Sequence, residues 1–164
     1  MSGMMDGKRG LVMGVANDKS IAWGIAKTLA AEGAELAFSY QGDAFGKRVE
    51  PLAASLGSDF LVDVDVTDPA SMDACFGTIA DRWGKLDFLV QAIAFSDKSE
   101  LMGRFVKTSR DNFLNSLNIS CYSFIDCAQR AEPLMTDGGT PVSYTHLRAH
   151  ETPEHLVCRL LLEK

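Results

Sequence analysis

Short apolar runs alternate with helical spacings of apolar residues from Gly10 to about Gly139. Four of these runs predict buried strands, near residues 10–16, 34–40, 60–66 and 86–94. Helical spacing separates them and returns from Thr108 to Met135, with room for one break. Strands that alternate with helices predict a Rossmann-like, doubly wound parallel sheet of the α/β class. Right-handed crossovers would place the first strand centrally and the third at one edge.

End signals mark the predicted helices. Ser20 can cap a helix over residues 21–32, with Ile21, Ile25 and Leu29 on its apolar face. Asp68 followed by Pro69 can begin the third helix. The buried face of that third helix is predicted to comprise Met72, Phe76, Ile79 and Trp83.

The character of the sequence changes after Gly139. All three histidines fall at or after position 146, and none of the 14 glycines falls after position 139. Because the alternation of strands and helices stops there, we expect the sheet to be truncated after about four strands. The sequence thus predicts two segments. Residues 1–139 would be the N-terminal part of a dinucleotide-binding domain, and residues 140–164 a tail of unrelated character, not native to the fold.

Composition and charge narrow the function classes. The chain is 46% hydrophobic and 23% charged, as is usual for globular proteins. A net charge of −6 argues against nucleic-acid and membrane partners, because both surfaces would repel an acidic chain. The sequence lacks a membrane-spanning run and begins without a signal-peptide core, which predicts a cytoplasmic protein. We expect reduced, packing roles for its four scattered cysteines, Cys75, Cys121, Cys127 and Cys158.

A glycine turn follows the first predicted strand. Gly14 would let the backbone turn sharply and approach a ligand, and the amides at the start of the next helix favour a pyrophosphate. Gly24 would let that helix pack closely on the strand. The spacing is wider than GxGxxG, so the turn alone fits a structural role equally well. Its position in a βαβ array favours nucleotide binding.

The other strand ends should meet at the same crevice. Gln41 follows the second strand, Asp65 and Val66 the third, and Ile93 the fourth. Gln41 can hydrogen-bond a ribose hydroxyl or the adenine edge, and it offers no charge to a 2′-phosphate. Asp65 could accept a hydrogen bond from the adenine amino group or cap the following helix. Asp68 is the better cap, which would leave Asp65 to the ligand.

Between about Met5 and Gly139, the chain resembles the bacterial NADH-dependent enoyl-acyl-carrier-protein reductases, a branch of the short-chain dehydrogenase/reductase superfamily. Five segments carry the resemblance, in this order: GVANDKSIAWGIA, AELAFSYQG, LGSDFLVDVDVTD, WGKLDFLVQAIAFSDK and ISCYSF. Gln91 is a small departure, because the family segment usually reads VHAIAF. Its side chain would face the core or the adenine region.

The resemblance implies an activity and a set of site residues. Members use NADH to reduce the 2,3 double bond of an enoyl chain held on acyl carrier protein, in type II fatty-acid synthesis. A tyrosine stabilises the enolate and a lysine holds the cofactor ribose. The full-length parent is expected to form a homo-oligomer. The resemblance places Ser96 near the acyl substrate, and it places on the dinucleotide Gly14, Ser20, Ile21, Gln41, Asp65, Val66 and Ile93.

The residues after Gly139 depart from the family pattern. Members continue with an apolar fifth strand, two tyrosines and, from the second of these, a Tyr-x6-Lys spacing. Here the one tyrosine after Gly139 is Tyr144, which comes too early, and position 151 is Glu151. We therefore predict no catalytic residue in this chain and no activity as it is written.

The tail also carries a spacing typical of zinc ligands, at His146, His150 and His155. Pro153 interrupts any helix there and no HExxH motif is present, so we expect no metal and interpret the segment as peptide read from non-genomic DNA. Two other function classes stay open: a non-catalytic nucleotide-binding fragment and a different short-chain carbonyl reductase. A reading frame that continues past codon 139 with the missing strand, tyrosines and lysine would favour the enoyl reductase.

Overall fold

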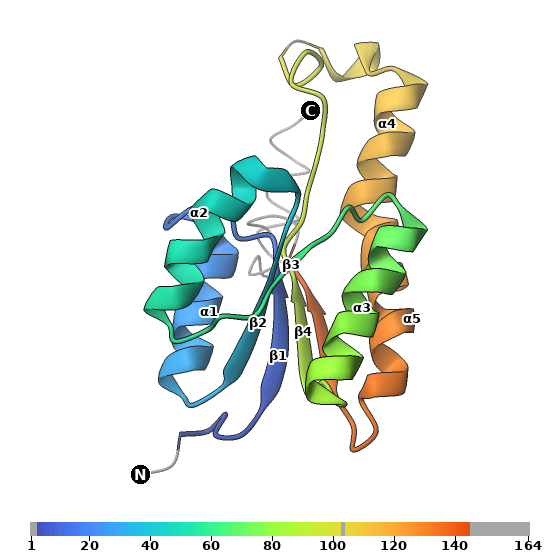
Figure 1. Cartoon of the computed structure of the whole chain (residues 1–164). Coiled ribbons are helices and arrows are strands. Elements are labelled where there is room, and N and C mark those ends of the chain that lie inside the picture. The colour runs from blue at the N-terminus through green and yellow to red at the C-terminus, as the bar shows by residue number, and fades with distance from the viewer. Residues whose placement is uncertain (1–2, 103, 145–164) are drawn as a thin grey trace, which may run out of the picture.

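The computed structural model describes residues 3–102 and 104–144. Its strands form one parallel sheet in the order β3-β2-β1-β4-β5 (Figure 1). The central place of β1 and the edge position of β3 confirm the prediction from crossover handedness. The strands are β1 (Arg9–Met13), β2 (Glu35–Tyr40), β3 (Leu61–Asp63), β4 (Phe88–Gln91) and β5 (Thr140–Ser143).

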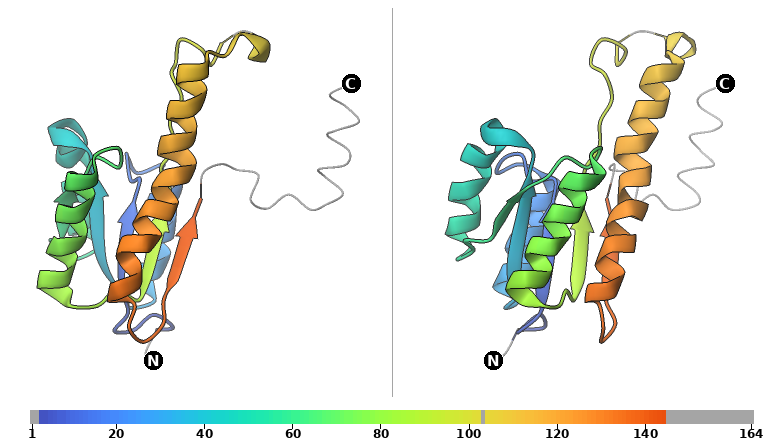
Figure 2. Two further views of the ribbon diagram at one scale, coloured as in Figure 1. Left: turned by 90° about the vertical axis from the view of Figure 1, so that its right-hand side faces the viewer. Right: turned by 45° about the vertical axis from the view of Figure 1, so that its right-hand side comes forward.

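Helices cover both faces of the sheet (Figure 2). One face carries α1 and α2, and the other carries α3 and α5. A π-helical segment, η2, joins α4 to α5, so the two form one long helix that extends beyond the sheet. The Rossmann-like α/β fold is therefore confirmed. The helices are α1 (Ile21–Ala31), α2 (Gly42–Ser55), α3 (Pro69–Trp83), η1 (Phe105–Lys107), α4 (Arg110–Leu117), η2 (Asn118–Tyr122), α5 (Ser123–Ala131) and η3 (Glu132–Leu134).

Two apolar clusters fill the layers, because successive strand side chains point to opposite faces. Leu11 and Met13 of β1 pack toward α3 and α5, while Val12 packs toward α1 and α2. Two buried cysteines, Cys75 and Cys127, belong to the first cluster, and burial raises the pKa of each thiol to about 12. Both are therefore protonated packing groups at neutral pH.

The helix ends agree with the sequence better than the helix faces do. Asp68 caps α3, its Oδ1 accepting from the Ala70 amide at 3.0 Å. On the predicted face of α3, Met72, Phe76 and Ile79 are buried, while Trp83 is half-buried. On α1, however, the buried residues are Ala22, Trp23 and Ala26, while Ile21 is 41% exposed. The prediction for Gly24 is also wrong, since no atom of another element lies within 4 Å of where its Cβ would stand.

A fifth strand extends the sheet past the four that the sequence predicts. Thr140–Ser143 pairs in parallel with β4, and the amide of Tyr144 donates to the carbonyl of Gln91 at 2.8 Å. All four strand residues are exposed and one is proline, so no apolar run signals the strand. The boundary expected after Gly139 is thus corrected for residues 140–143, which belong to the sheet. The rest of the predicted tail, 145–164, lies outside the described residues, as do its histidines and Cys158.

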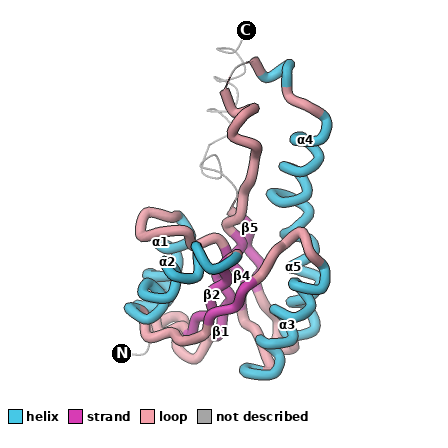
Figure 3. The backbone as a smooth tube through the Cα atoms, turned by 45° about the horizontal axis from the view of Figure 1, so that its top comes forward, coloured by secondary structure: helices cyan, strands magenta, loops and turns pink. Residues whose placement is uncertain are grey.

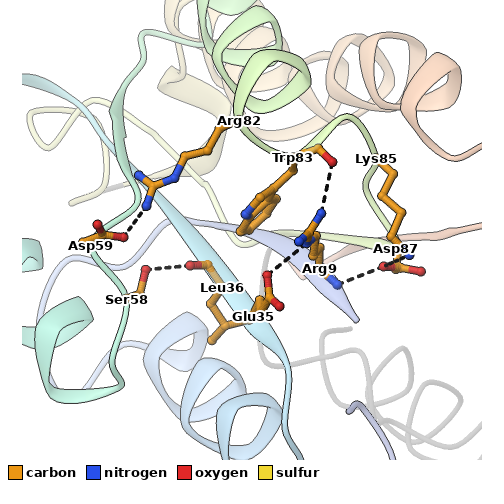
Figure 4. A network of polar contacts seen from close by, with 9 residues as sticks. All are labelled: Arg9, Glu35, Leu36, Ser58, Asp59, Arg82, Trp83, Lys85 and Asp87. Atoms are coloured by element: carbon orange, nitrogen blue, oxygen red, sulfur yellow. Dashed lines mark hydrogen bonds and ion pairs between the residues drawn. The ribbon is translucent and has the colours of Figure 1, made fainter. Parts of the chain in front are cut away.

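Ion pairs and hydrogen bonds gather at the amino ends of the strands (Figure 4). Arg9 donates to Glu35 at 2.9 Å and to the Trp83 carbonyl at 3.1 Å. Asp87 accepts from the Arg9 amide at 2.9 Å and from the Lys8 ammonium at 3.0 Å. These bonds hold together the starts of β1, β2 and β4.

Within the described part of the chain, no helix is long and apolar enough to cross a membrane.

Asp87→Asn should lower the free energy of unfolding at neutral pH by about 1.5–3 kcal/mol, the usual range for hydrogen bonds to a charged group. Burial raises the pKa of Asp87, but the Arg9 amide, Lys8 and Lys85 together outweigh it and hold that pKa below its ordinary value. A carboxyl with a depressed pKa stabilises the fold above about pH 4, and this contribution is lost as the pH falls further.

Urea unfolding of the wild type and of Asp87→Asn, from neutral pH to below about pH 4, measures the difference in their free energies of unfolding. The difference should be constant near neutrality and shrink in acid. Asp59→Asn is a suitable control, because Asp59 pairs with Arg82 but its side chain is 86% exposed, and its loss should cost much less. A difference between wild type and Asp87→Asn that did not change with pH would contradict the assignment.

Candidate nucleotide-binding site

A pocket of about 620 Å³ lies at the carboxyl ends of β1 to β4. Five of the predicted site residues line it, one or two from each strand end: Gly14, Gln41, Asp65, Val66 and Ile93. Ligands of doubly wound sheets bind at this edge. The structure therefore brings these five residues together, while their contact with a cofactor stays a prediction.

Gly14 directly follows β1 and lies against the backbone that leaves β4. Its φ of 97° lies in the left-handed region, and a Cβ there would stand 2.2 Å from the carbonyl oxygen of Ala92. The Ala92 amide donates to the Met13 carbonyl at 3.0 Å, which holds the two backbones at this separation. Only glycine satisfies both the dihedral and the space.

Ser20 and Ile21 lie at the start of α1 and do not line the pocket itself. Ser20 is the N-cap residue, but its hydroxyl accepts from the amides of Ala16 and Asn17, each at 3.0 Å. It thus shapes the loop before α1 instead of capping the helix. The amides of Ile21 and Ala22 donate no hydrogen bond to any described residue. Free amides and the positive end of the helix dipole suit a phosphate.

Asp65 is partly engaged by its own turn. One of its oxygens accepts from the Thr67 hydroxyl at 2.6 Å and from the Thr67 amide at 2.8 Å. The Thr67 hydroxyl has the largest effect on the pKa of Asp65 and the Thr67 amide the next largest. Together they hold that pKa below its ordinary value although burial raises it, and the Gln41 side chain lowers it further. Asp65 is therefore ionised at neutral pH and lies beside Gln41, while Asp68 serves as the cap.

Ser96 follows Phe95, which lines the pocket. The Ser96 hydroxyl accepts from Asn112 Nδ2 at 3.5 Å, and Asn112 Oδ1 accepts from the Asp97 amide at 3.0 Å. Asn112 belongs to α4, so that helix holds the segment leaving β4. Ser96 is placed next to the pocket wall but not in its lining.

The helical wall of the pocket was not predicted. Asn115 on α4 and Ile119 on η2 complete the lining. Gln91 is fully buried, and its Nε2 donates to Ser123 Oγ at 2.8 Å, which donates to the Ile119 carbonyl at 2.6 Å. Of the two predicted environments, Gln91 thus occupies the core, where it ties η2 to the sheet. The only sequence signal for η2 was the break allowed in the helical spacing.

The described residues hold one tyrosine–lysine pair at the spacing of the family, Tyr40 and Lys47. Tyr40 ends β2, and its ring packs against Gly46 of α2, where a Cβ would lie 2.9 Å from the ring. The spacing here reflects a strand followed by a helix, and we assign it no catalytic role.

No group of three or more His, Cys, Asp or Glu side chains suited to a metal occurs between residues 3 and 144, position 103 aside.

The sheet order, the helices on both faces and the pocket at the carboxyl ends of the strands define a Rossmann-like domain. Sequence comparison narrows this class further. A family model described as Enoyl-(Acyl carrier protein) reductase matches residues 14–156, and the chain belongs to that family.

Relatives support this assignment at high identity. An enoyl-[acyl-carrier-protein] reductase [NADH] 2 of Rhizobium meliloti is 61% identical over 146 residues, which are 89% of this chain and 54% of that protein. The chain thus spans about half the length of the curated relatives it matches.

Two solved structures show the same fold. An Anaplasma phagocytophilum reductase in complex with NAD has a TM-score of 0.86 and 51% identity, covering 99% of this chain and 64% of that one. A Bacillus cereus reductase with NADP+ and indole naphthyridinone has a TM-score of 0.85 and 39% identity, covering 93% and 60%.

Proposed function

We propose that the full-length parent of this chain is an NADH-dependent enoyl-acyl-carrier-protein reductase of type II fatty-acid synthesis, and that the chain as written is inactive. Bound NADH would supply a hydride to the β-carbon of an enoyl thioester carried by acyl carrier protein. The observation that carries the proposal is the pocket at four strand ends, beside the free amides of α1, in a chain of this family. A cytoplasmic location and a homo-oligomeric parent belong to the same proposal.

The residues of the pocket suit the parts of a dinucleotide. The amides of Ile21 and Ala22 would bind the pyrophosphate, with Ser20 fixing the loop that precedes them. Gln41 and Asp65 would hydrogen-bond the adenosine, and Gly14 leaves room for the ligand at the strand end. Val66 and Ile93 would give apolar contact, while Ser96 would lie near the acyl chain.

The protein should bind NADH more tightly than NADPH, by on the order of 10-fold. Gln41 offers no positive charge, and the ionised Asp65 beside it would repel a 2′-phosphate. The Bacillus cereus reductase has been solved with NADP+, which carries such a phosphate. Fluorescence titration of this protein with both cofactors measures the preference.

Gln41→Arg should move the preference toward NADPH, while Gln41→Asn, which adds no charge, should not. Equal affinities in the wild type, or tighter NADPH binding, would contradict the proposed cofactor.

We also propose, from the sequence, that the residues beyond the sheet are not native to the fold. The reading frame at the locus should instead continue with an apolar segment, two tyrosines and a lysine. Sequencing the genomic locus past codon 139 tests this expectation.

A non-catalytic nucleotide-binding protein is the second candidate. It is favoured by one observation, that the single Tyr-x6-Lys pair among the described residues is structural. A locus without the missing residues would favour that candidate.

A further inference from the structure

The helix that forms one wall of the pocket keeps the same face toward the rest of the domain over an unusual length. After β4 the chain runs beyond the sheet to the start of α4, and it returns along the sheet through η2 and α5 (Figure 3). At steps of four residues, Asn115 and Ile119 line the pocket. The next steps, at Ser123, Cys127 and Ala131, are buried. In a regular α-helix each step of four overshoots a full turn by about 40°, so the series would wind almost halfway around the helix.

The π-helical turn η2 counters this rotation, because a turn closed by i→i+5 hydrogen bonds takes up an extra residue. The turn ends at Tyr122, directly before Ser123. The Ser123 hydroxyl donates to the Ile119 carbonyl, four residues back, at 2.6 Å. In a regular α-helix that carbonyl accepts from the amide of residue 123, and a serine hydroxyl that competes for it bends the helix. The side chain of Ser123 therefore favours the wider turn.

A buried amide of β4 fixes the direction of that hydroxyl. Ser123 gives its one hydroxyl proton to Ile119, so toward Gln91 its oxygen can only accept. Gln91 Nε2 donates to it at 2.8 Å, and Gln91 Oε1 accepts from Ser143 Oγ of β5 at 3.1 Å. Gln91 is fully buried and Ser123 is 1% exposed, so water does not compete for the bond between them. One side chain thus joins two strands to the helical wall.

A second hydrogen bond ties η2 to the segment that leaves β4. Ser120 Oγ accepts from the Phe95 amide at 3.1 Å, and Phe95 lines the pocket. The turn that carries Ile119 is therefore held from the sheet at two points, Ser120 and Ser123. Only the second of these is reached by a side chain of the sheet core.

We propose that Gln91 is a positioning residue for the cofactor, which acts through Ser123 and the turn η2 to hold the side chain of Ile119 against the bound dinucleotide. The inference rests on the proposed function, because it takes the pocket to be the cofactor site. Histidine, which the family segment VHAIAF carries at this place, suits the same task. A neutral imidazole also offers one donor and one acceptor, as the bonds to Ser123 and Ser143 require.

The first test is NADH affinity, measured by fluorescence titration. Gln91→Leu keeps a similar volume but loses both hydrogen bonds, and it should weaken NADH binding about 10-fold, as expected when one aliphatic contact is withdrawn. Ser123→Ala removes the other partner and should have a similar effect, and it decides the matter if Gln91→Leu does not fold. Gln91→His should bind NADH within about threefold of the wild type, since it keeps a donor and an acceptor.

Ser58→Ala is the matched control for Ser123→Ala. Ser58 Oγ also donates to a backbone carbonyl at 2.6 Å, but its partner is Leu36, near the amino end of β2 and away from the pocket. Loss of this bond should change NADH affinity by less than about twofold. Equal losses of affinity in Ser58→Ala and Ser123→Ala would overturn the proposal, because a general loss of stability would then explain both.

A double-mutant cycle tests whether Gln91 acts through Ile119. Ile119→Ala should weaken NADH binding, and adding Gln91→Leu to it should cause little further loss, because both changes remove one contact. Gln41→Ala acts at another strand end, so its loss and that of Gln91→Leu should multiply. Losses that multiply for Ile119 as they do for Gln41 would overturn the assigned route.

Hydrogen exchange over residues 118–123, measured without cofactor, separates the inference from the proposed function. Exchange there should be at least about 10-fold faster in Gln91→Leu and Ser123→Ala than in the wild type, and unchanged in Ser58→Ala. Unchanged exchange in Gln91→Leu, or faster exchange with wild-type NADH affinity, would overturn the positioning role and leave the proposed function standing. A wild type that binds no NADH would remove the proposed function, and the positioning role with it.

Discussion

Gly14→Ala should abolish NADH binding and remove a large part of the stability of the domain. A left-handed backbone costs a residue with a Cβ about 1–2 kcal/mol. The new methyl would also lie 2.2 Å from the Ala92 carbonyl oxygen, so β4 or the turn must move, and such overpacking costs about 1–3 kcal/mol more. Domains of this kind are stable by only about 5–15 kcal/mol. Because the displaced turn forms the pocket wall, binding should fail even in molecules that stay folded.

Urea unfolding and NADH titration measure the two effects. Gly57→Ala is the matched control, since Gly57 has a φ of 76° but open space around its Cβ position. Gly57→Ala should show the free-energy cost of the left-handed dihedral alone, and it should keep the NADH affinity of the wild type. Wild-type NADH binding by Gly14→Ala would contradict the close-approach explanation.

The 164-residue chain should reduce an enoyl thioester no faster than buffer, even with NADH in excess. A positioned proton donor contributes about 10² to 10⁴ in rate, and the described residues hold no tyrosine–lysine pair at the pocket beyond the structural one at Tyr40 and Lys47. Loss of NADH absorbance with crotonyl thioester measures the rate. The Rhizobium meliloti relative is a suitable positive control. Clear turnover that disappears in Tyr144→Phe would show that Tyr144 is the donor.

Local signals made most of the fold predictable. Asp68 and Pro69 begin a helix wherever the chain can form one, and crossover handedness then orders the strands. The face of α1 was predicted less well, because Ala22 and Ala26 repeat at the same spacing as Ile21 and Ile25. Two apolar registers compete on that helix, and packing against the sheet decides between them.

Features set by distant pairing were not predictable in this way. The strand β5 contains Pro141 and no buried residue, and its place follows from the open edge of β4. Within the site, the residues at strand ends followed from topology, since parallel strands present their carboxyl ends together. The partner of the Ser20 hydroxyl did not, because the loop conformation decides which amides it reaches. Ile119 reaches the pocket through η2, whose π-helical turn has no sequence signature of its own.

The polar network of Figure 4 and the pocket occupy opposite ends of the same strands. Arg9, Glu35 and Asp87 precede or begin strands, whereas Gln41 and Asp65 follow them. Natural selection can therefore change cofactor preference at one end with little effect on the contacts that keep the domain folded at the other. Because most substitutions destabilise, this separation widens the range of specificities that descendants of such a domain can explore before they lose the fold.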